Sequence, residues 1–370
     1  MSTRIRTGLV VATAAAAAAT TAVAQPIMDG QLDGDYPSYS SLQGIETSFG
    51  DADFGQPGFC NGSELNAIHI DYRDDFVVIF LAGNLESIYN KLDVFIDARP
   101  GGQNQLRHDN SDTDYGGLLR MGNSNENATD GLIFDTGFEP DVWISFTCGN
   151  DSNNDGAFVT YANFAPLKTD GEGFGFYLGS GSSGTNVLNG ENGIQIAIDN
   201  SNVGGVTGGT GSSCGVDVGT GIEIAIPAFV FDWDFEGLEI TDVSVCAFIN
   251  GTGHDYISNQ VMAGMPPMDS LGEPRGLDFN TIPGDQFARM GDIAKACPEY
   301  NYGACCLGDV CVVTSEDNCN AGSGDFLGVD SECQEETCLP PDCATDINDD
   351  GTTNVDDLLE LLANYGQPCI

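Results

Sequence analysis

Oxygen-bearing side chains near the end of the chain have the spacing of a calcium-binding loop. Calcium in proteins prefers about six to eight oxygen ligands. Counted from Asp346, these residues stand at positions one, three, five, seven, nine and twelve, and Gly351 at position six allows the positive φ of a tight turn. The expected ligands are Asp346, Asn348, Asp350, Thr352 (through its backbone carbonyl), Asn354 and Asp357. An acidic helical tail without calcium is the alternative.

A helix should follow this loop and carry its last ligand. Gly366 and Pro368 are expected to end the helix. Cys343 and Cys369 bracket the module, and a disulfide between them would stabilise it by roughly 3.5 kcal/mol in the chain-entropy model. The apolar residues that share one helical face are Val355, Leu358, Leu359 and Leu362.

This loop and helix resemble one repeat of a type I dockerin. No helix precedes the loop, and Asp357 stands at position twelve, where EF-hands usually carry Glu. A full dockerin has two such repeats; residues 346–370 resemble one, a half-dockerin. The resemblance implies calcium as a cofactor and a cohesin-like receptor as a partner.

A second segment, Asp151–Gly156, repeats the opening of the calcium motif. Its position twelve is Ala162, whose side chain cannot bind a metal. Strand-like runs flank the segment on both sides, so we predict a hairpin turn there.

The three histidines give little support for catalysis. The pair His254-Asp255 could orient a nucleophile, but no G-x-S-x-G motif accompanies it. His108 lies beside the acidic run Asp109–Asp114, which we expect to be a solvated loop rather than a metal site, and His69 fits a strand pattern. A glycosidase needs two carboxylates, but 56 acidic residues make such a pair impossible to locate from sequence. We therefore assign no catalytic residue.

The overall charge excludes two classes of partner. The chain has 370 residues, with 56 acidic and 11 basic side chains, for a formal net charge of −45. Such a surface repels nucleic acid and anionic lipid. Because 41% of the residues are apolar, the chain can still bury a core, and we expect a folded protein.

The N-terminus has the features of an export signal. Arg4 and Arg6 precede an apolar, Ala-rich run, and Ala22–Ala24 forms a small-x-small cleavage site. We expect cleavage near Ala24-Gln25 and a secreted or cell-surface protein without membrane insertion; an N-terminal membrane anchor is the alternative. An exported protein with 13 cysteines should form disulfides.

The elements that must position these residues are mainly β-strands. We predict a signal peptide at 1–24, a β-sandwich domain at 25–296, a Cys-rich disulfide segment at 297–339 and the calcium loop-helix module at 340–370. Period-two patterns bounded by Gly, Asn and Asp indicate antiparallel strands of a sandwich or jelly roll. The strand-like runs are 76–81, 92–97, 143–148, 194–198, 222–226 and 242–249. The Gly-, Ser- and Asn-rich stretch 171–221 should form long loops around the run at 194–198.

Six cysteines close together predict a disulfide-stapled segment rather than a zinc knuckle, because no C-x2-C pair occurs and the chain is exported. They are Cys305, Cys306, Cys311, Cys319, Cys333 and Cys338. We assign no pairing among them, and Cys297 has no expected partner. In the front domain, Cys60, Cys148, Cys214 and Cys246 are expected to form two bridges.

The front domain resembles family-nine-type carbohydrate-binding modules and related DOMON-like sandwiches. Those domains open with Ile-Asp-Gly-x-Leu-Asp, and Asp29–Gly34 has this pattern after Met28. The run Leu92–Asp97 resembles their hydrophobic strand ending in Asp, and Tyr36 and Tyr39 stand where a Trp is usual.

The whole chain resembles secreted proteins of environmental bacteria. Those proteins join such a sandwich to a Cys-rich segment and a dockerin-like tail. The resemblance implies that the protein is exported and has this order of domains. It implies no enzymatic activity. The matching stretches are Ala82–Glu86, Gly101–Leu106, Phe134–Glu139 and Cys246–Gly251.

These observations favour a secreted, non-catalytic binding or display protein, with carbohydrate or an extracellular surface as the ligand. The alternatives are a polysaccharide hydrolase targeted by its dockerin-like tail and a structural cell-surface component. A binding module would present an exposed aromatic row, whereas a hydrolase would place two facing carboxylates in a cleft. We expect the two tryptophans, Trp143 and Trp233, to lie in the core.

Replacing Asp346 and Asp350 with Ala should abolish calcium-dependent stabilisation of the C-terminal module. Without an ion the crowded carboxylates repel one another, and a divalent cation reverses that interaction. Thermal unfolding with calcium and with a chelator measures the effect. Identical melting curves of the unmodified protein in both conditions would contradict the site.

Overall fold

The computed structural model describes most of the front domain and parts of the rest of the chain. Residues 1–26 and 339–352 lie outside the described residues, so the export signal and most of the calcium loop are not placed. The described ranges are 27–34, 36–43, 47, 62–151, 155–171, 173–182, 185–188, 193–199, 218–233, 238–265, 268–293, 302–308, 310–315, 319–320, 324–328, 331, 333, 337–338, 353–363 and 365.

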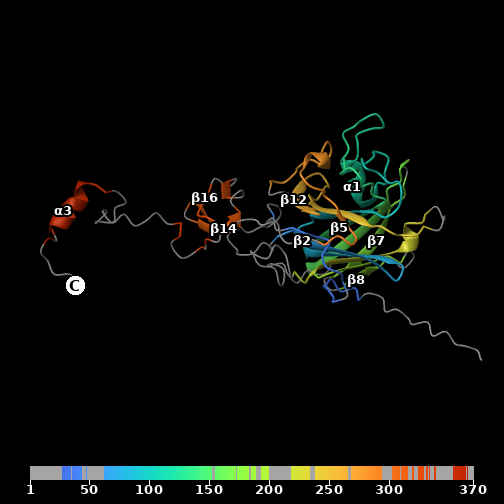
Figure 1. Ribbon diagram of the computed structural model, residues 1–370, viewed down its shortest axis with the longest axis horizontal. Coiled ribbons are helices and arrows are strands. Elements are labelled where there is room, and N and C mark those ends of the chain that lie inside the picture. Colours follow the sequence, from blue (N-terminus) through green and yellow to red (C-terminus); the bar gives the residue numbers. More distant parts are fainter. Residues whose placement is uncertain are drawn as a thin grey trace, which may run out of the picture.

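Two antiparallel sheets account for most of the described front domain (Figure 1). One has six strands in the order β1 (Ser41–Leu42), β2 (Glu64–Arg73), β3 (Phe76–Asn84), β10 (Gly221–Pro227), β9 (Gln195–Ile198) and β8 (Thr185–Leu188). The other has seven, in the order β12 (Ile257–Met262), β11 (Ser244–Asn250), β4 (Lys91–Asp97), β5 (Val142–Asp151), β6 (Ala157–Pro166) and β7 (Phe176–Gly181), with β13 (Ala288–Arg289) beside β11.

The facing sides of the two sheets bury one apolar core. Alternate residues of each strand point inward, as the period of two requires. Ile79 and Ile224 come from the six-stranded sheet, Val94 and Ile144 come from the seven-stranded sheet, and all four are fully buried. β-Branched side chains suit this pleated surface, so the alternating Ile and Val pattern both forms the strands and packs them.

A second apolar layer covers part of the outer face of the seven-stranded sheet. It includes α1 (Thr113–Met121) and η2 (Phe279–Thr281). Phe95, Trp143 and Phe248 of the sheet pack in one cluster with Phe134 and Phe279 of the covering segments. In Figure 1, α1 lies on one side of the sandwich and β8 on the other. The seven-stranded sheet is therefore buried on both faces where this layer reaches.

The mainly β, antiparallel architecture predicted from sequence is confirmed, whereas the jelly-roll connectivity stays a prediction. The six strand-like runs correspond to β3, β4, β5, β9, β10 and β11. The prediction of loops throughout 171–221 was wrong, because β7 and β8 lie in that stretch. Gly and Ser at these positions hide the alternation on which strand prediction depends.

The predicted hairpin at Asp151–Gly156 is confirmed. β5 ends at Asp151, β6 begins at Ala157, and the two strands pair along their whole length. The backbone N–H of Gly156 donates to the carbonyl of Asp151 at 3.0 Å. Asp155 and Gly156 have φ values of 52° and 75°, and such positive φ values are typical of residues in tight hairpin turns.

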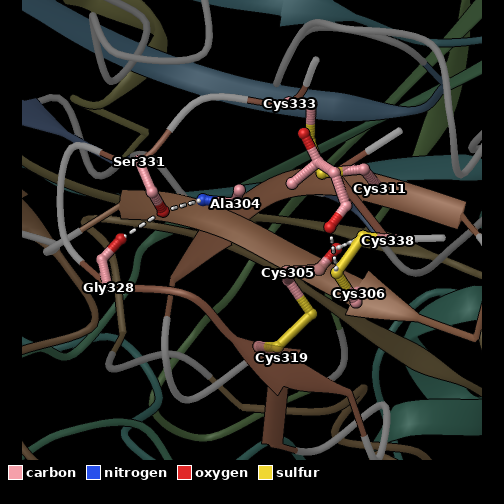
Figure 2. Close-up of a disulfide and its surroundings, with 10 residues drawn as sticks. Ala304, Cys305, Cys306, Cys311, Cys319, Gly328, Ser331, Cys333 and Cys338 are labelled. Atoms are coloured by element: carbon pink, nitrogen blue, oxygen red, sulfur yellow. Dashed lines mark hydrogen bonds between the residues drawn. A yellow bond between two sulfur atoms is a disulfide. The ribbon is translucent and has the colours of Figure 1, made fainter. Parts of the chain in front are cut away.

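Three disulfides staple a small third sheet, made of β14 (Tyr302–Leu307), β15 (Val310–Ser315) and β16 (Asp325–Phe326). The pairs are Cys305–Cys319, Cys306–Cys338 and Cys311–Cys333 (Figure 2). The hydroxyl of Ser331 accepts the backbone N–H of Ala304 at 2.7 Å and holds a connecting segment on the sheet. The predicted disulfide segment is confirmed, and cross-links of this kind stabilise a sheet too small to bury a large core.

The expectation of two bridges in the front domain was wrong for the two cysteines that are described. Cys148 and Cys246 are buried free thiols. Cys148 lies in the core between the sheets, whereas Cys246 packs in the layer outside the seven-stranded sheet. The sheet itself separates the two thiols. Cys60 and Cys214, like Cys297, Cys343 and Cys369, lie outside the described residues.

Alkylation under non-reducing conditions should distinguish these two classes of cysteine. We expect Cys148 and Cys246 to be unreactive in the native protein, because both thiols are buried and burial raises their pKa. Both should react after unfolding in denaturant without reductant. Peptide mapping by mass spectrometry checks this and should recover the three disulfides of the third sheet. A native disulfide that contains either thiol would contradict the structure.

Candidate functional site

On the outer face of the seven-stranded sheet, the side chains are apolar beneath the covering layer, charged in the next rows and aromatic towards the exposed edge. The strand register places Lys91, Thr147 and Tyr161 directly opposite one another on β4, β5 and β6. The next row contains Asp93, Ser145, Asn163 and Tyr177. Trp143 lies one row further on, under the covering layer. A continuous polar path therefore leads from beneath α1 to the open face of β6 and β7.

A buried histidine connects two carboxylates at the inner end of this path. His254 Nδ1 lies 2.9 Å from Asp93 Oδ1, and His254 Nε2 lies 3.0 Å from Asp114 Oδ2. The histidine follows β11 in the chain, Asp93 lies on β4 and Asp114 lies in the first turn of α1. The imidazole thus links the sheet to the layer that covers it.

A lysine balances the charge of this network. Lys91 Nζ lies 3.0 Å from Asp114 Oδ1 and 2.7 Å from Thr147 Oγ1, and the hydroxyl of Ser145 donates to the same aspartate. The four ionisable groups (Lys91, Asp93, Asp114 and His254) are almost fully buried. Charges buried in this way require opposite charges and hydrogen bonds at close range, and each group here has both.

Two further donors fix the second carboxylate. The indole N–H of Trp143 donates to Asp93 Oδ1 at 2.9 Å, and the amide of Asn250 donates to Asp93 Oδ2 at 3.0 Å. The network is therefore a closed structural unit: among the described residues, its carboxylates already accept hydrogen bonds from groups on several strands.

The network sets the protonation of its members. Burial alone would lower the pKa of His254, but Asp93 and Asp114 outweigh it and raise that pKa to about 9. Burial would likewise raise the pKa of Asp114, but the hydrogen bond and positive charge of His254, together with Lys91, hold it well below its usual range. At neutral pH the imidazole is charged and Asp114 is ionised.

The network anchors a turn of unusual backbone conformation. Asp114, Tyr115 and Gly116 have consecutive φ values of 52°, 55° and 80°. Left-handed conformations cost non-glycine residues on the order of 1 kcal/mol or more each, so the surrounding contacts must hold them. Because Asp114 is fixed below, the side chain of Tyr115 points outward and is fully exposed.

Four tyrosines, Tyr89, Tyr115, Tyr161 and Tyr177, gather at the outer end of the polar path; we call them the tyrosine face. Partial burial and then the charge of Asp151 raise the pKa of Tyr161, and the other three tyrosines add to the same shift. Tyr161 therefore lies within electrostatic range of each of the other three tyrosines. Tyr177 and Tyr89 are 52% and 46% exposed.

One ring of the tyrosine face is held against the sheet. A Cβ atom at Gly149 would lie 2.3 Å from the ring of Tyr89, so the missing side chain makes room for the ring. The hydroxyl of Tyr89 donates to the carbonyl of Asn150 at 2.9 Å, and its backbone N–H donates to the carbonyl of Cys148 at 2.8 Å. The ring is therefore fixed at both ends.

Most of the residues predicted to bind calcium are not placed. Asp346, Asn348, Asp350 and Thr352 lie outside the described residues. Asn354 and Asp357 flank the start of the predicted helix, α3 (Val355–Ala363). The backbone N–H of Asn354 donates to Asp357 Oδ2 at 2.6 Å, and Asn354 Oδ1 accepts the N–H of Asp356 at 2.7 Å. These bonds form a helix cap and turn the buried Asp357 back towards the loop.

The described residues contain no group of three or more His, Cys, Asp or Glu side chains arranged to hold a metal ion. Within the same part of the chain, no helix has the length and apolar character needed to span a bilayer.

His254, which is next to Asp255 in the sequence, hydrogen-bonds to Asp93 and Asp114. The expectation about the residues near His108 needs correction. The acidic run near His108 is not uniformly solvated, because Asp114 is buried and Asp109 pairs with Arg107 at 2.6 Å. His69 is a buried strand residue, as expected.

The expectation that both tryptophans lie in the core holds for Trp143 but only in part for Trp233. Trp143 is fully buried, and Trp233 is half-buried beneath the guanidinium of Arg99, whose Cζ lies 4.4 Å from the ring centroid. The tyrosine face and the charge network were both missed from sequence. The alternation within β4 predicts that Lys91 and Asp93 lie on one face of the sheet. It does not predict that Tyr161 and Tyr177 lie beside them, because that depends on the register between strands.

The network should make stability fall at alkaline pH. Because the folded protein raises the pKa of His254 from 6.5 to about 9, the stabilisation by the charged ring is complete below pH 6.5 and is lost as the pH rises towards 9. The loss should be on the order of 3 kcal/mol. Denaturant unfolding between these pH values measures it. His254→Gln should reduce the slope to the part contributed below pH 8 by Asp141, whose pKa burial raises to about 8.

The matched control is His69→Gln. Burial lowers the pKa of His69, so this histidine titrates below the same pH window and its replacement should leave the slope intact. An alkaline slope of the same size in His254→Gln as in the unmodified protein would show that the network does not hold a proton.

Comparisons with known proteins assign no family to the chain. No protein-family model, no curated protein and no solved structure matches it. The function of the site is therefore inferred from its geometry and chemistry.

Proposed function

We propose that the chain is a secreted, non-catalytic carbohydrate-binding protein and that the tyrosine face is its binding surface. The observation that carries this proposal is the gathering of four partly or fully exposed tyrosines on one open face of a sheet. Aromatic rings stack against the apolar CH faces of sugars, and phenolic hydroxyls bond to sugar hydroxyls.

The rigidity of the face supports binding. Tyr89 is fixed on Gly149, and Tyr115 stands on a turn that the buried network holds. A ligand that stacks on rings already in place does not have to pay for ordering them. The left-handed turn at Asp114 and Tyr115 fits the same role, because strained backbone in folded proteins concentrates at functional sites.

The chemistry of the network favours binding over hydrolysis. Asp151 is the single carboxylate beside Tyr161, whereas the paired carboxylates Asp93 and Asp114 lie at the inner end of the polar path. Both are almost completely buried and committed to internal donors. A glycosidase carboxylate must reach the glycosidic oxygen or the anomeric carbon, and these two groups are covered by α1 and by the residues around His254.

We also propose that the C-terminal module binds calcium and serves as a docking element. The cap at Asn354 and Asp357 supports the position expected for the last two ligands, because it directs the Asp357 carboxylate to the loop side of α3. Leu358, Leu359 and Leu362 are each more than half exposed, which suits a helix that contacts a receptor.

Truncating the tyrosine face should weaken binding to polysaccharide. Affinity electrophoresis against xylan, galactomannan, laminarin and hydroxyethylcellulose should show retardation of the full chain by at least one polymer. Tyr115→Ala and Tyr177→Ala should each reduce that affinity by about tenfold, since each removes one stacking ring worth on the order of 1 kcal/mol.

Phe229→Ala is the matched control. Phe229 is an aromatic residue of similar exposure, at 64%, on η1 (Ala228–Val230) after β10 of the other sheet. Its loss should leave affinity unchanged. Equal loss in all three variants, or binding by none of the polymers, would overturn the proposal.

A further inference from the structure

We infer that the ligand of the tyrosine face is an extended, neutral glycan chain that lies across β5, β6 and β7, rather than a single sugar or a chain end. This inference rests on the proposed function and goes beyond it by naming the class and direction of the ligand.

The strand register gives the direction. Tyr89 covers β5 at Gly149, Tyr161 stands on β6 and Tyr177 stands on β7. The three rings thus occupy successive strands, and each lies one register row further along the sheet than the last. They cross the strands diagonally, over more than the roughly 10 Å of two interstrand gaps. One pyranose ring is too short to contact all three. A chain of several units that crosses the strands would contact each ring in turn.

The shape of the face also favours a continuous chain. The rings stand at an exposed edge of the sheet, beside α1, which contacts β6 and β7. Ser180 opposite Tyr161 is exposed, and Tyr177 belongs to β7, the last strand in the order of its sheet. An open surface lets a polymer enter and leave at both sides. Recognition of a chain end would need walls around the terminal sugar, and the fully exposed Tyr115 does not form one.

The charge around the face selects a neutral polymer. Asp151 lies near Tyr161 and is the charged neighbour with the largest effect on it. The cations of the charge network, Lys91 and His254, are buried and engaged by Asp93 and Asp114. The chain carries a formal net charge of −45. Uronate or sulfate groups would therefore meet net repulsion at this face.

The test is an affinity series by calorimetry with the full chain. The probes are cello-, xylo-, manno- and laminari-oligosaccharides of one to six units, together with polygalacturonate as an anionic polymer. In the series that binds best, affinity should rise by at least about tenfold from one unit to four and then level off. Polygalacturonate should not bind.

The variant Tyr177→Ala tests the direction. It removes the ring at the β7 end of the tyrosine face. The affinity should therefore level off at a shorter oligosaccharide, while the affinity for the shortest binding probe stays the same. Phe229→Ala should follow the unmodified protein at every length. A uniform loss at all lengths would show that Tyr177 belongs to a single-sugar site and would overturn the inference.

Two results separate this inference from the proposed function. Equal affinity for one unit and for six, or tight binding of polygalacturonate, would overturn the extended neutral chain and leave carbohydrate binding in place. Absence of binding by every probe and by the parent polysaccharides would overturn both.

Discussion

The ion pair between His254 and Asp114 joins the sheet to the layer that covers it, and the outer face depends on that contact. The histidine is tied to Asp93 on β4 at 2.9 Å and reaches Asp114 at 3.0 Å. Without the imidazole of His254, Asp114 would keep its ion pair with Lys91 and its hydrogen bond from Ser145. It would lose its link to the segment after β11. Breaking a buried pair on one side costs several kcal/mol, because the remaining charge stays buried.

This contact makes the polar interior and the exposed tyrosines one structure. The same carboxylate that accepts the charge of His254 and Lys91 carries the left-handed turn that displays Tyr115. Thr147 bonds to Lys91 and stands directly opposite Tyr161 in the register. A charged network buried between a sheet and its covering layer is a costly way to gain stability, so its position beneath an aromatic surface fits a role in holding that surface in shape.

The sequence predicted the class of the fold better than it predicted the site. Alternating isoleucines, such as Ile222, Ile224 and Ile226, specify a strand whatever its neighbours are, and six dense cysteines specify a stapled segment. The site depends on pairing instead. Lys91 and Asp114 are far apart in sequence, and a φ of 52° at an aspartate has no clear signature in composition.

The calcium module, in contrast to the tyrosine face, can be predicted from the sequence without knowledge of the strand pairing. Its ligand spacing can be read from Asp346 to Asp357 without any tertiary contact, because all the ligands come from one loop and one helical turn. The described start of α3 fits that spacing at Asn354 and Asp357. Local motifs are thus accessible to sequence analysis, whereas a surface assembled from four strands and a turn requires the register.

The most direct test of a carbohydrate-binding tyrosine face is an NMR titration of the full chain, labelled with ¹³C on its tyrosine rings, with the neutral polysaccharide that retards it. The chain has 11 tyrosines, so the four of the face can be compared with the others in one sample. We expect the ring signals of Tyr89, Tyr115, Tyr161 and Tyr177 to shift together, while Tyr36 and Tyr72 on the six-stranded side stay unchanged. Shifts confined to tyrosines outside the face would contradict the account.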